Sequence, residues 1–417
     1  MAFQQGLSGL NAASKNIEVI GNNVANASTV GFKQSRTEFA DVYANSLGGG
    51  NASKIGIGTK IAAITQQFTQ GNISNSQNPL DVAINGNGFF RMSDNGAITY
   101  SRNGQFQLSK DGYIENASGQ RLTGYALVNG QIQTGALTEL RIDAADLAPR
   151  ATTSITGPLN LDSRADILDP DLFDINDPST YSHSTPIEVF DSLGNSHAVQ
   201  LYYLKTGVDT AVTPATTTWT IMASADGVQT PVGTPPVPVG TMVFTGSGIN
   251  PTITPATPNI SIPVGTGGLT PMSVTLNLAG STQFANSFSE SDLGQDGYSA
   301  GRLSSFSVGS DGSILGRYSN GQSAILGQVA LANFRNLNGL QPLGDNQWAE
   351  TSESGPPIIG VANSGGLGVL QSYRLEDSNV DLTAELVNMI TAQRVYQANA
   401  QTIKTEDQIM QTLVNLR

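Results

Sequence analysis

Apolar side chains recur at helical spacing at both ends of the chain. The intervals alternate between four and three residues, and Ser14 and Gly21 fill the gaps in the N-terminal series. The apolar and aromatic members are Phe3, Leu7, Leu10, Ile17 and Val24 near the N-terminus, and Leu382, Leu386, Met389, Tyr396, Ala400, Ile403, Met410 and Val414 near the C-terminus. A stripe with this period predicts an amphipathic helix at each end that packs against partner helices along its length.

The C-terminal helix is expected to be long. Ser378-Asn379 supplies N-cap chemistry, and Asp381 and Glu385, in or near the first turns, interact favourably with the helix dipole. Because no Gly or Pro interrupts residues 381–417, the helix can extend over about 37 residues, or roughly 55 Å.

Side chains off the C-terminal stripe indicate self-association. The additional apolar residues are Val387, Ile390, Ile409, Leu413 and Leu416. A single pair of unequal helices buries only one stripe on each member, so these side chains need further neighbours, which other copies of the chain would supply. The remaining surface of this helix is rich in Asn and Gln. An amide-rich, weakly charged face also suits a wetted channel that other chains must pass without sticking.

Between the ends the apolar period changes to two, which favours β-strands. Residues 80–84 and 89–92 flank Asn85-Gly86-Asn87-Gly88, a strong signal for a hairpin. Further turn signals between short strand-like runs are Asn103-Gly104, Asp111-Gly112, Ser118-Gly119, Ser310-Asp311-Gly312 and Asn320-Gly321. Two stretches of β-meander therefore lie on either side of a long middle segment.

The middle segment, from about residue 149 to 288, has its own character. It opens with an acidic loop over residues 162–177, and residues 186–190 and 197–204 predict a hairpin around Asp191–Asn195. Residues 209–271 are rich in Thr, Pro and Gly, which excludes long helices and suits loops and edge strands. The predicted order is helix, meander, β-insert, meander and long helix, a mainly β fold with long terminal α-helices.

Composition removes several classes of function. The 417-residue chain has a formal net charge of −13, so it repels phosphate backbones, and we expect no nucleic-acid binding. It has no cysteine, which excludes disulfides, thiolate metal sites and Cys nucleophiles and fits an extracellular protein. The N-terminus has no basic segment followed by an apolar run, so we expect no cleaved secretory signal. No apolar stretch is long enough for a membrane-spanning helix, and we expect no membrane insertion.

Candidate chemistry is sparse. His183 and His197 are the two histidines, and without a second ligand at a recognisable spacing they are better interpreted as polar residues of a β-domain than as a base or metal ligands. The acidic loop lacks the Gly and terminal Glu of a calcium loop, so we interpret it as solvated. Residues 48–54 lack the Gly-Lys-Ser/Thr of a phosphate loop and are interpreted as a flexible connector. We therefore expect no catalytic residue, metal or cofactor, and no enzyme activity.

Two terminal motifs resemble the signatures of bacterial flagellar rod and hook proteins. The N-terminal motif spans residues 22–33, and the C-terminal motif spans 378–400. The motif residues singled out in the first are Asn23, Ala25, Asn26, Gly31, Phe32 and Lys33. The ending 403–417, together with segments 80–90, 100–106 and 326–334, is similar to the hook members of this family in particular. The resemblance covers residues 1–150 and 285–417.

The resemblance implies a structural subunit that polymerises with itself into a curved, flexible tube. Such a tube acts as a universal joint that transmits torque from rod to filament, and it forms part of the export channel. The implied location is the extracellular hook of the flagellum, reached through the flagellar type III export apparatus without signal cleavage. The implied partners are further copies of the chain, a hook cap protein, a distal rod protein, a hook–filament junction protein and the export apparatus.

The family plan divides the chain into nested parts. Residues 1–25 and 376–417 would form an inner helical polymerisation domain, 26–75 and 364–375 a linker, 76–148 and 288–363 a discontinuous β-rich domain, and 149–287 an inserted outer β-domain. A distal rod protein shares both terminal motifs but typically lacks so large an insert. A secreted β-rich adhesin would explain the middle segment but not the two helical stripes, and a glycan-acting enzyme would need a carboxylate pair that the sequence does not locate.

Overall fold

The computed structural model describes residues 2–42, 56–128, 130–142, 146–263 and 271–415. The chain divides into two compact units, the first made of residues up to 144, 305–317 and from 323 onward, and the second of 145–304 and 318–322. The connector expected at residues 48–54 lies outside the described residues.

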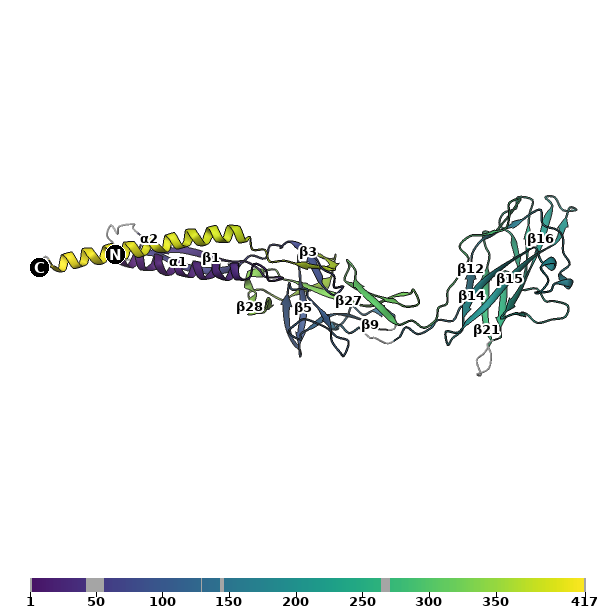
Figure 1. Cartoon of the computed structure of the whole chain (residues 1–417), viewed down its shortest axis with the longest axis horizontal. Coiled ribbons are helices and arrows are strands. Elements are labelled where there is room, and N and C mark those ends of the chain that lie inside the picture. Colours follow the sequence, from purple (N-terminus) through teal and green to yellow (C-terminus); the bar gives the residue numbers. More distant parts are fainter. Residues whose placement is uncertain (1, 43–55, 129, 143–145, 264–270, 416–417) are drawn as a thin grey trace. The chain divides into compact units, whose positions relative to one another are not determined.

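Two helices of the first unit lie side by side, α1 (Ala2–Ala25) and α2 (Leu382–Asn415) (Figure 1). They are antiparallel, because Gly6 of α1 lies against Ile403 of α2 and Gly9 lies against Asn399. A Cβ added at Gly9 would be 2.8 Å from Asn399 Oδ1, so the two backbones approach closely where α1 has no side chain.

The start of α2 corrects the N-cap expected at Ser378-Asn379. Asp381 is the cap, because its Oδ1 accepts hydrogen bonds from Thr383 N at 2.9 Å and Ala384 N at 3.1 Å. Asn379 instead accepts a hydrogen bond from Gln34 N at 2.7 Å. The amide is therefore used to join two distant segments of the chain rather than to begin the helix.

A two-stranded antiparallel ribbon packs against α1. It consists of β1 (Ser35–Val42) and β2 (Gly58–Gln66), with a register shift between Glu38 and Phe39. Because an isolated pair of strands is marginally stable, the ribbon depends on the helix for its order.

Most strands of the first unit belong to one 13-stranded sheet. Its main path runs β25 (Leu303–Val308), β26 (Ser313–Tyr318), β27 (Ser323–Asn333), β9 (Arg121–Val128), β5 (Phe89–Asp94), β6 (Ala97–Ser101), β29 (Gln347–Ala349) and β28 (Gln341–Gly344). The attached strands are β7 (Gln107–Leu108), β8 (Ile114–Glu115), β10 (Gln131–Ile132), β11 (Thr138–Glu139) and β30 (Ile358–Val361). A short 3₁₀ helix, η3 (Leu337–Gly339), precedes β28. The hairpins expected at Asp111-Gly112, Ser310–Gly312 and Asn320-Gly321 are confirmed.

The hairpin expected around residues 85–88 is wrong. The strand β4 (Val82–Asn85) pairs with β31 (Val369–Ser372), while β5 pairs with β6, β9 and β27. The glycines of this turn have positive φ, but its backbone is held by distant partners, since Gly368 N donates to Asn87 O at 2.7 Å. A second short pair joins β3 (Ile73–Asn75) to β32 (Arg374–Glu376). Segments about 290 residues apart thus supply the pairing that a local hairpin would have made.

An aromatic cluster fills the first unit beside the sheet. Phe89, Phe334 and Trp348 are buried, and their rings pack edge to face at centroid distances of 5.6 to 6.2 Å. Phe68, which follows the ribbon, contributes a third edge-to-face contact to Trp348 at 5.5 Å. The ribbon and the sheet therefore share one core.

The described residues of the second unit form three sheets. The six-stranded sheet runs β14 (His183–Phe190), β15 (Ser196–Asp209), β16 (Thr216–Ala225), β18 (Gly240–Phe244) and β19 (Thr252–Thr254), with β17 (Val228–Gln229) beside β16. A four-stranded sheet runs β20 (Asn259–Ile262), β21 (Met272–Asn277), β12 (Ser154–Thr156) and β24 (Gly294–Gln295). A three-stranded sheet contains β22 (Thr282–Phe284), β13 (Leu159–Asp162) and β23 (Ser289–Glu290). The hairpin expected around Asp191–Asn195 is confirmed as β14–β15, and Pro186 lies on an edge strand, where its missing N–H is harmless.

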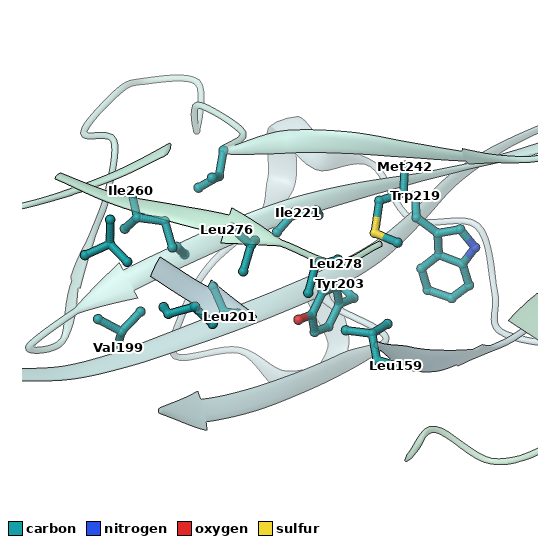
Figure 2. Packing of buried hydrophobic residues seen from close by; sticks show 14 of the residues in the cluster. Leu159, Val199, Leu201, Tyr203, Trp219, Ile221, Met242, Ile260, Leu276 and Leu278 are labelled. Carbon is teal, nitrogen blue, oxygen red and sulfur yellow. The ribbon is translucent and has the colours of Figure 1, made fainter. Parts of the chain in front are cut away.

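Side chains from these sheets fill one buried core (Figure 2). Leu201, Tyr203 and Ile221 come from the six-stranded sheet, and Ile260 and Leu276 from the four-stranded sheet. The fold is thus mainly β with long terminal helices, as expected from the sequence.

The acidic loop covers the opposite face of the six-stranded sheet. Phe173 is buried against Tyr202, Leu204 and Met222 of that sheet. The loop contains the 3₁₀ helix η1 (Pro170–Leu172), which is capped by the carboxylate of Asp169, and it ends at Asp177, whose carboxylate caps the following 3₁₀ helix η2 (Pro178–Thr180). These acidic residues therefore have structural partners in the nearby backbone.

Candidate assembly surface and the junction at its base

The apolar side chains of α2 remain largely exposed in the single chain. Of the predicted stripe, Met389 and Ile403 are half-buried, whereas Met410 and Val414 are 60% and 71% exposed. The exposed large apolar residues of this helix are Leu382, Leu386, Val387, Ile390, Val395, Tyr396, Ile409, Met410 and Val414, here called the α2 apolar surface. A surface of this many exposed large apolar side chains is costly in water, so it is suited to packing against other chains.

The contact between α1 and α2 involves small residues of α1 together with one member of the predicted stripe, because Gly6 lies against Ile403 and Gly9 against Asn399. On α1 the buried residues are Gly6, Ala12, Ala13, Ile20 and Asn23, while Phe3 and Leu7 of the stripe are exposed and Leu10, Ile17 and Val24 are half-buried. On α2 the buried residues are Glu385 and Ala392. Small residues let the two backbones approach closely, and they leave the larger apolar side chains facing outward. The signal that would have located this contact is the spacing of Gly6, Gly9 and Ala13, not hydrophobicity.

A buried charge cluster lies where the helices meet the β-structure, here called the junction. Lys33 Nζ is 2.7 Å from Glu376 Oε1, and Arg102 Nη1 is 3.0 Å from Glu376 Oε2. The side chains of Lys33 and Glu376 are fully buried, and that of Arg102 is 5% exposed. Glu376 precedes α2 by only a few residues and Lys33 follows α1, so one carboxylate links both helices to the sheet.

Backbone groups complete the junction. Lys33 Nζ also donates to Thr69 O at 2.7 Å, and Gly71 N donates to Glu376 Oε1 at 2.9 Å. Arg102 Nη2 donates to Gly86 O at 2.7 Å, and its guanidinium lies over the ring of Phe89. These contacts satisfy much of the hydrogen-bonding capacity of the charges, which is what makes their burial tolerable.

The electrostatics of the junction depend on Glu376. Burial lowers the pKa values of Lys33 and Arg102 because it disfavours their charged forms, and the negative charge of Glu376 opposes both shifts. Two buried cations thus rely on one anion, and loss of that anion leaves both without compensation.

Two residues of the N-terminal motif, Gly31 and Lys33, bond directly to Glu376 of this junction, since Gly31 N donates to its backbone O at 2.8 Å. Asn23 pairs with the backbone of Ser35 in both directions, donating to its O at 2.8 Å and accepting from its N at 2.9 Å. Gly31 has φ +72°, and an added Cβ would lie 2.6 Å from Asn103 N, so only glycine fits this position. Phe32 and Lys33 are buried. Ala25, at the end of α1, is exposed, and Asn26 bonds within its own turn to Asn22 O at 2.9 Å.

Neither Glu376 nor Arg102 belongs to a site predicted from the sequence. Glu376 lies 343 residues from Lys33 and 274 from Arg102, so no local spacing relates the three.

The two histidines have structural partners. His183 stacks on Phe288 at a centroid distance of 4.7 Å, and burial lowers its pKa. His197 Nδ1 is 2.7 Å from Asp226 Oδ2, and this contact joins the start of β15 to the turn between β16 and β17. Among the described residues, no group of three or more potential ligands could hold a metal ion.

The described part of the chain contains no helix that is long and apolar enough to cross a membrane.

Gly71→Ala should weaken the junction. An added Cβ would lie 1.9 Å from Asp377 O, which is part of the backbone and cannot move aside cheaply. We expect the free energy of unfolding of the first unit to fall by about 1–3 kcal/mol, measured by urea unfolding followed through Trp348 fluorescence. Gly21→Ala is the matched control, because nothing lies within 4 Å of its added Cβ. Alanine in the α1 helix at this position should be neutral or stabilising, and equal losses for the two variants would contradict the prediction.

Comparison with known proteins places these features in a family context. Family models match residues 3–33 (flagella basal body rod protein), 83–156 (flagellar hook protein FlgE/F/G D1 domain), 160–298 (flagellar basal body protein FlaE D2 domain) and 371–416 (flagellar basal body rod FlgEFG protein C-terminal). The chain is 42% identical to the flagellar hook protein FlgE of Salmonella typhimurium over 436 residues, which covers 100% of both chains. It is 41% identical to FlgE of Escherichia coli K12 over 425 residues, again covering 100% of both.

More distant relatives are also flagellar hook proteins. The flagellar hook protein FlgE of Borreliella burgdorferi is 32% identical, and the match covers 100% of this chain and 99% of the relative. The crystal structure of Helicobacter pylori flagellar hook protein FlgE2 aligns with a TM-score of 0.52 at 14% identity, covering 73% of this chain and 100% of that one. At that identity the structural match supports the fold alone.

Proposed function

The chain belongs to the flagellar hook protein family and is a structural subunit of the hook, and from this premise we propose that its helices hold the hook together. The observation that carries the proposal is the α2 apolar surface, which one chain leaves exposed. Copies of the chain would bury it against one another, with α1 and α2 ordered by the junction behind them. Burial of apolar surface is the dominant favourable term in such association.

The proposal also assigns a role to each part of the chain. Residues 1–25 and 376–417 would form the inner polymerisation domain, 26–75 and 364–375 the linker, 76–148 and 288–363 the β-rich domain, and 149–287 the outer β-domain. The amide-rich side of α2 would line the export channel. The outer domains would make weaker contacts, so that the tube bends as a universal joint while it transmits torque.

The proposed partners follow from a place in the hook. They are further copies of this chain, a hook cap protein, a distal rod protein and a hook–filament junction protein. The chain would pass through the flagellar type III export apparatus without signal cleavage and act outside the cell. It would have a structural role with no enzyme activity, no nucleic-acid binding and no membrane insertion.

Leu386→Asp tests whether the α2 apolar surface drives assembly. Leu386 is 45% exposed in the single chain, so the change should leave the fold intact but place a charge in the contact between copies. We expect the critical concentration for salt-induced tube formation to rise at least tenfold, a change of about 1.4 kcal/mol. Pelleting assays and negative-stain micrographs measure it.

Gln397→Asp supplies the control, because it adds the same charge to an exposed polar position of α2. It should change the critical concentration by less than about threefold, or under 0.7 kcal/mol. Circular dichroism should be unchanged in both variants. Normal tube formation by Leu386→Asp would show that the cohesion lies elsewhere.

A further inference from the structure

The methionines of this chain differ greatly in their access to solvent. Six of the seven lie among the described residues. Three on strands of the sheets are fully buried, namely Met92, Met222 and Met242. Met272 and Met389 are half-buried. Met410, near the end of α2, is 60% exposed and is the most accessible of the described methionines.

The position of Met410 along α2 explains its exposure. The two helices are antiparallel with Gly6 beside Ile403, so α1 begins about level with residue 407 of α2. The last turns of α2 continue past this level (Figure 1). Met410 therefore lies beyond the described start of α1, where α1 does not cover it.

The sulfur of Met410 is open to attack by a hydroperoxide. Thiols normally compete for such oxidants, but this chain has no cysteine, so its thioethers are the sulfur atoms available for oxidation. The hydroperoxide transfers one oxygen atom to a sulfur lone pair. The thioether is oxidised to a sulfoxide, and hydrogen peroxide is reduced to water. Because the oxidant must reach the sulfur, exposure favours Met410 over the other described methionines.

A sulfoxide at this position would enter an apolar contact. Met410 belongs to the α2 apolar surface, where its neighbours Ile409 and Val414 are 49% and 71% exposed. Oxidation converts a flexible apolar side chain into a polar one. Water can donate a hydrogen bond to the new oxygen only while the surface is exposed, so burial of the oxidised side chain against other chains carries a penalty.

We propose that Met410 is a reversible oxidation site that controls entry of the free chain into the tube. The inference rests on the proposed self-assembly and adds a form of regulation to it. A chain with the sulfoxide is excluded, whereas assembly shields the unmodified thioether from the oxidant. A methionine sulfoxide reductase would restore the chain, because a dithiol removes the oxygen as water and becomes a disulfide.

Partial oxidation of the unmodified chain provides the first test. Free chains are treated with hydrogen peroxide until about half carry a sulfoxide at Met410, the peroxide is removed, and tubes are formed with salt and pelleted. Mass spectrometry of peptides then measures the sulfoxide in each fraction. We expect the sulfoxide fraction at Met410 to be about tenfold higher in the supernatant than in the pellet. Sulfoxide at Met272, in the second unit, is the internal control and should divide evenly.

A variant without the sulfur provides the second test. Met410→Leu conserves the volume and apolar character of the side chain, so its critical concentration should stay within about threefold of that of the unmodified chain. Full oxidation should raise the critical concentration of the unmodified chain about tenfold and leave that of Met410→Leu unchanged. The two sulfoxide reductases, one for each epimer, should reverse the rise when supplied with dithiothreitol. Met389→Leu is the matched control and should remain sensitive to peroxide.

Protection by assembly is the third test. When preformed tubes are treated with peroxide, Met410 should be oxidised at least about tenfold more slowly than in free chains. Equal oxidation in tubes and free chains, or an even division of the Met410 sulfoxide between pellet and supernatant, would overturn the inference and leave the assembly function standing. Failure of the unoxidised chain to form tubes would instead contradict the proposed function itself.

Discussion

Replacing Glu376 by Gln should lower the free energy of unfolding of the first unit by about 3–5 kcal/mol, the range observed when one partner of a buried ion pair is removed. The amide retains the shape of the side chain but not its charge. Lys33 and Arg102 then remain buried without an anion, and their desolvation is no longer offset. A loss of this size is a large fraction of the stability of a typical domain.

The two tryptophans allow each unit to be followed separately. Trp348 lies in the core of the first unit and Trp219 in that of the second. In a Trp219→Phe background, urea unfolding followed by fluorescence reports the first unit alone. Lys15→Ala is the control, since it breaks an ion pair whose side chains are 57% and 58% exposed, and it should cost less than about 0.5 kcal/mol. A loss below about 1 kcal/mol for Glu376→Gln would contradict the prediction.

The pH dependence identifies the cause of this loss. Burial already lowers the pKa of Lys33, and removal of Glu376 removes the charge that opposes the shift. A cation whose pKa is lower in the folded state destabilises that state below the folded pKa, and the penalty is relieved as the pH rises through it. The deficit of Glu376→Gln should therefore shrink as the pH is raised from neutral toward about 10. Lys33→Met in the same background should recover part of the loss at neutral pH.

The terminal helices could be predicted from the sequence because their period is local, but the faces they bury could not. Hydrophobicity ranks Leu7, Leu386 and Met410 above Gly9 and Ala13, yet the larger side chains stay exposed while Gly9 lies against Asn399 and Ala13 is buried. Close approach of two backbones selects for the absence of a side chain. A stripe of large apolar side chains is thus as consistent with a contact to other chains as with a contact inside the same chain.

The missed features share long sequence separation. The turn at residues 85–88 has the composition of a hairpin, but β4 pairs with β31 instead. Glu376 lies beyond the reach of any spacing rule that begins from Lys33. The N-terminal motif resembles a family signature, and the structure shows which contacts its residues make. Gly31 and Lys33 join segments from both ends of the chain, and Asn23 joins the end of α1 to the start of β1.

The second unit offers a clean point for excision. Two antiparallel bridges pair the segments that lead into it and out of it, Leu147 with Gly301 and Arg150 with Tyr298. Arg150 N donates to Tyr298 O at 3.0 Å, and Tyr298 N donates to Arg150 O at 2.9 Å. Because the two strands already run side by side, residues 151–297 can be replaced by an Asn-Gly turn without opening a gap.

Such a deletion should leave a chain that assembles into tubes with altered curvature. A bending tube lengthens on one side and shortens on the other, so its outermost contacts must slide or exchange. Well-packed apolar interfaces resist continuous sliding, whereas small polar contacts exchange with water at little cost. If the insert is the outer domain, as proposed, it tunes curvature while the α2 apolar surface supplies cohesion. The deletion variant should therefore form straight or differently curved tubes, measured by electron microscopy, and cells that carry it should swim poorly.

The circular dichroism of the deletion variant and the fluorescence of its Trp348 should report a folded first unit. Tubes with native curvature would remove the insert from the bending mechanism. A folded variant that forms no tubes would instead place cohesion in the second unit, against the role proposed for the helices.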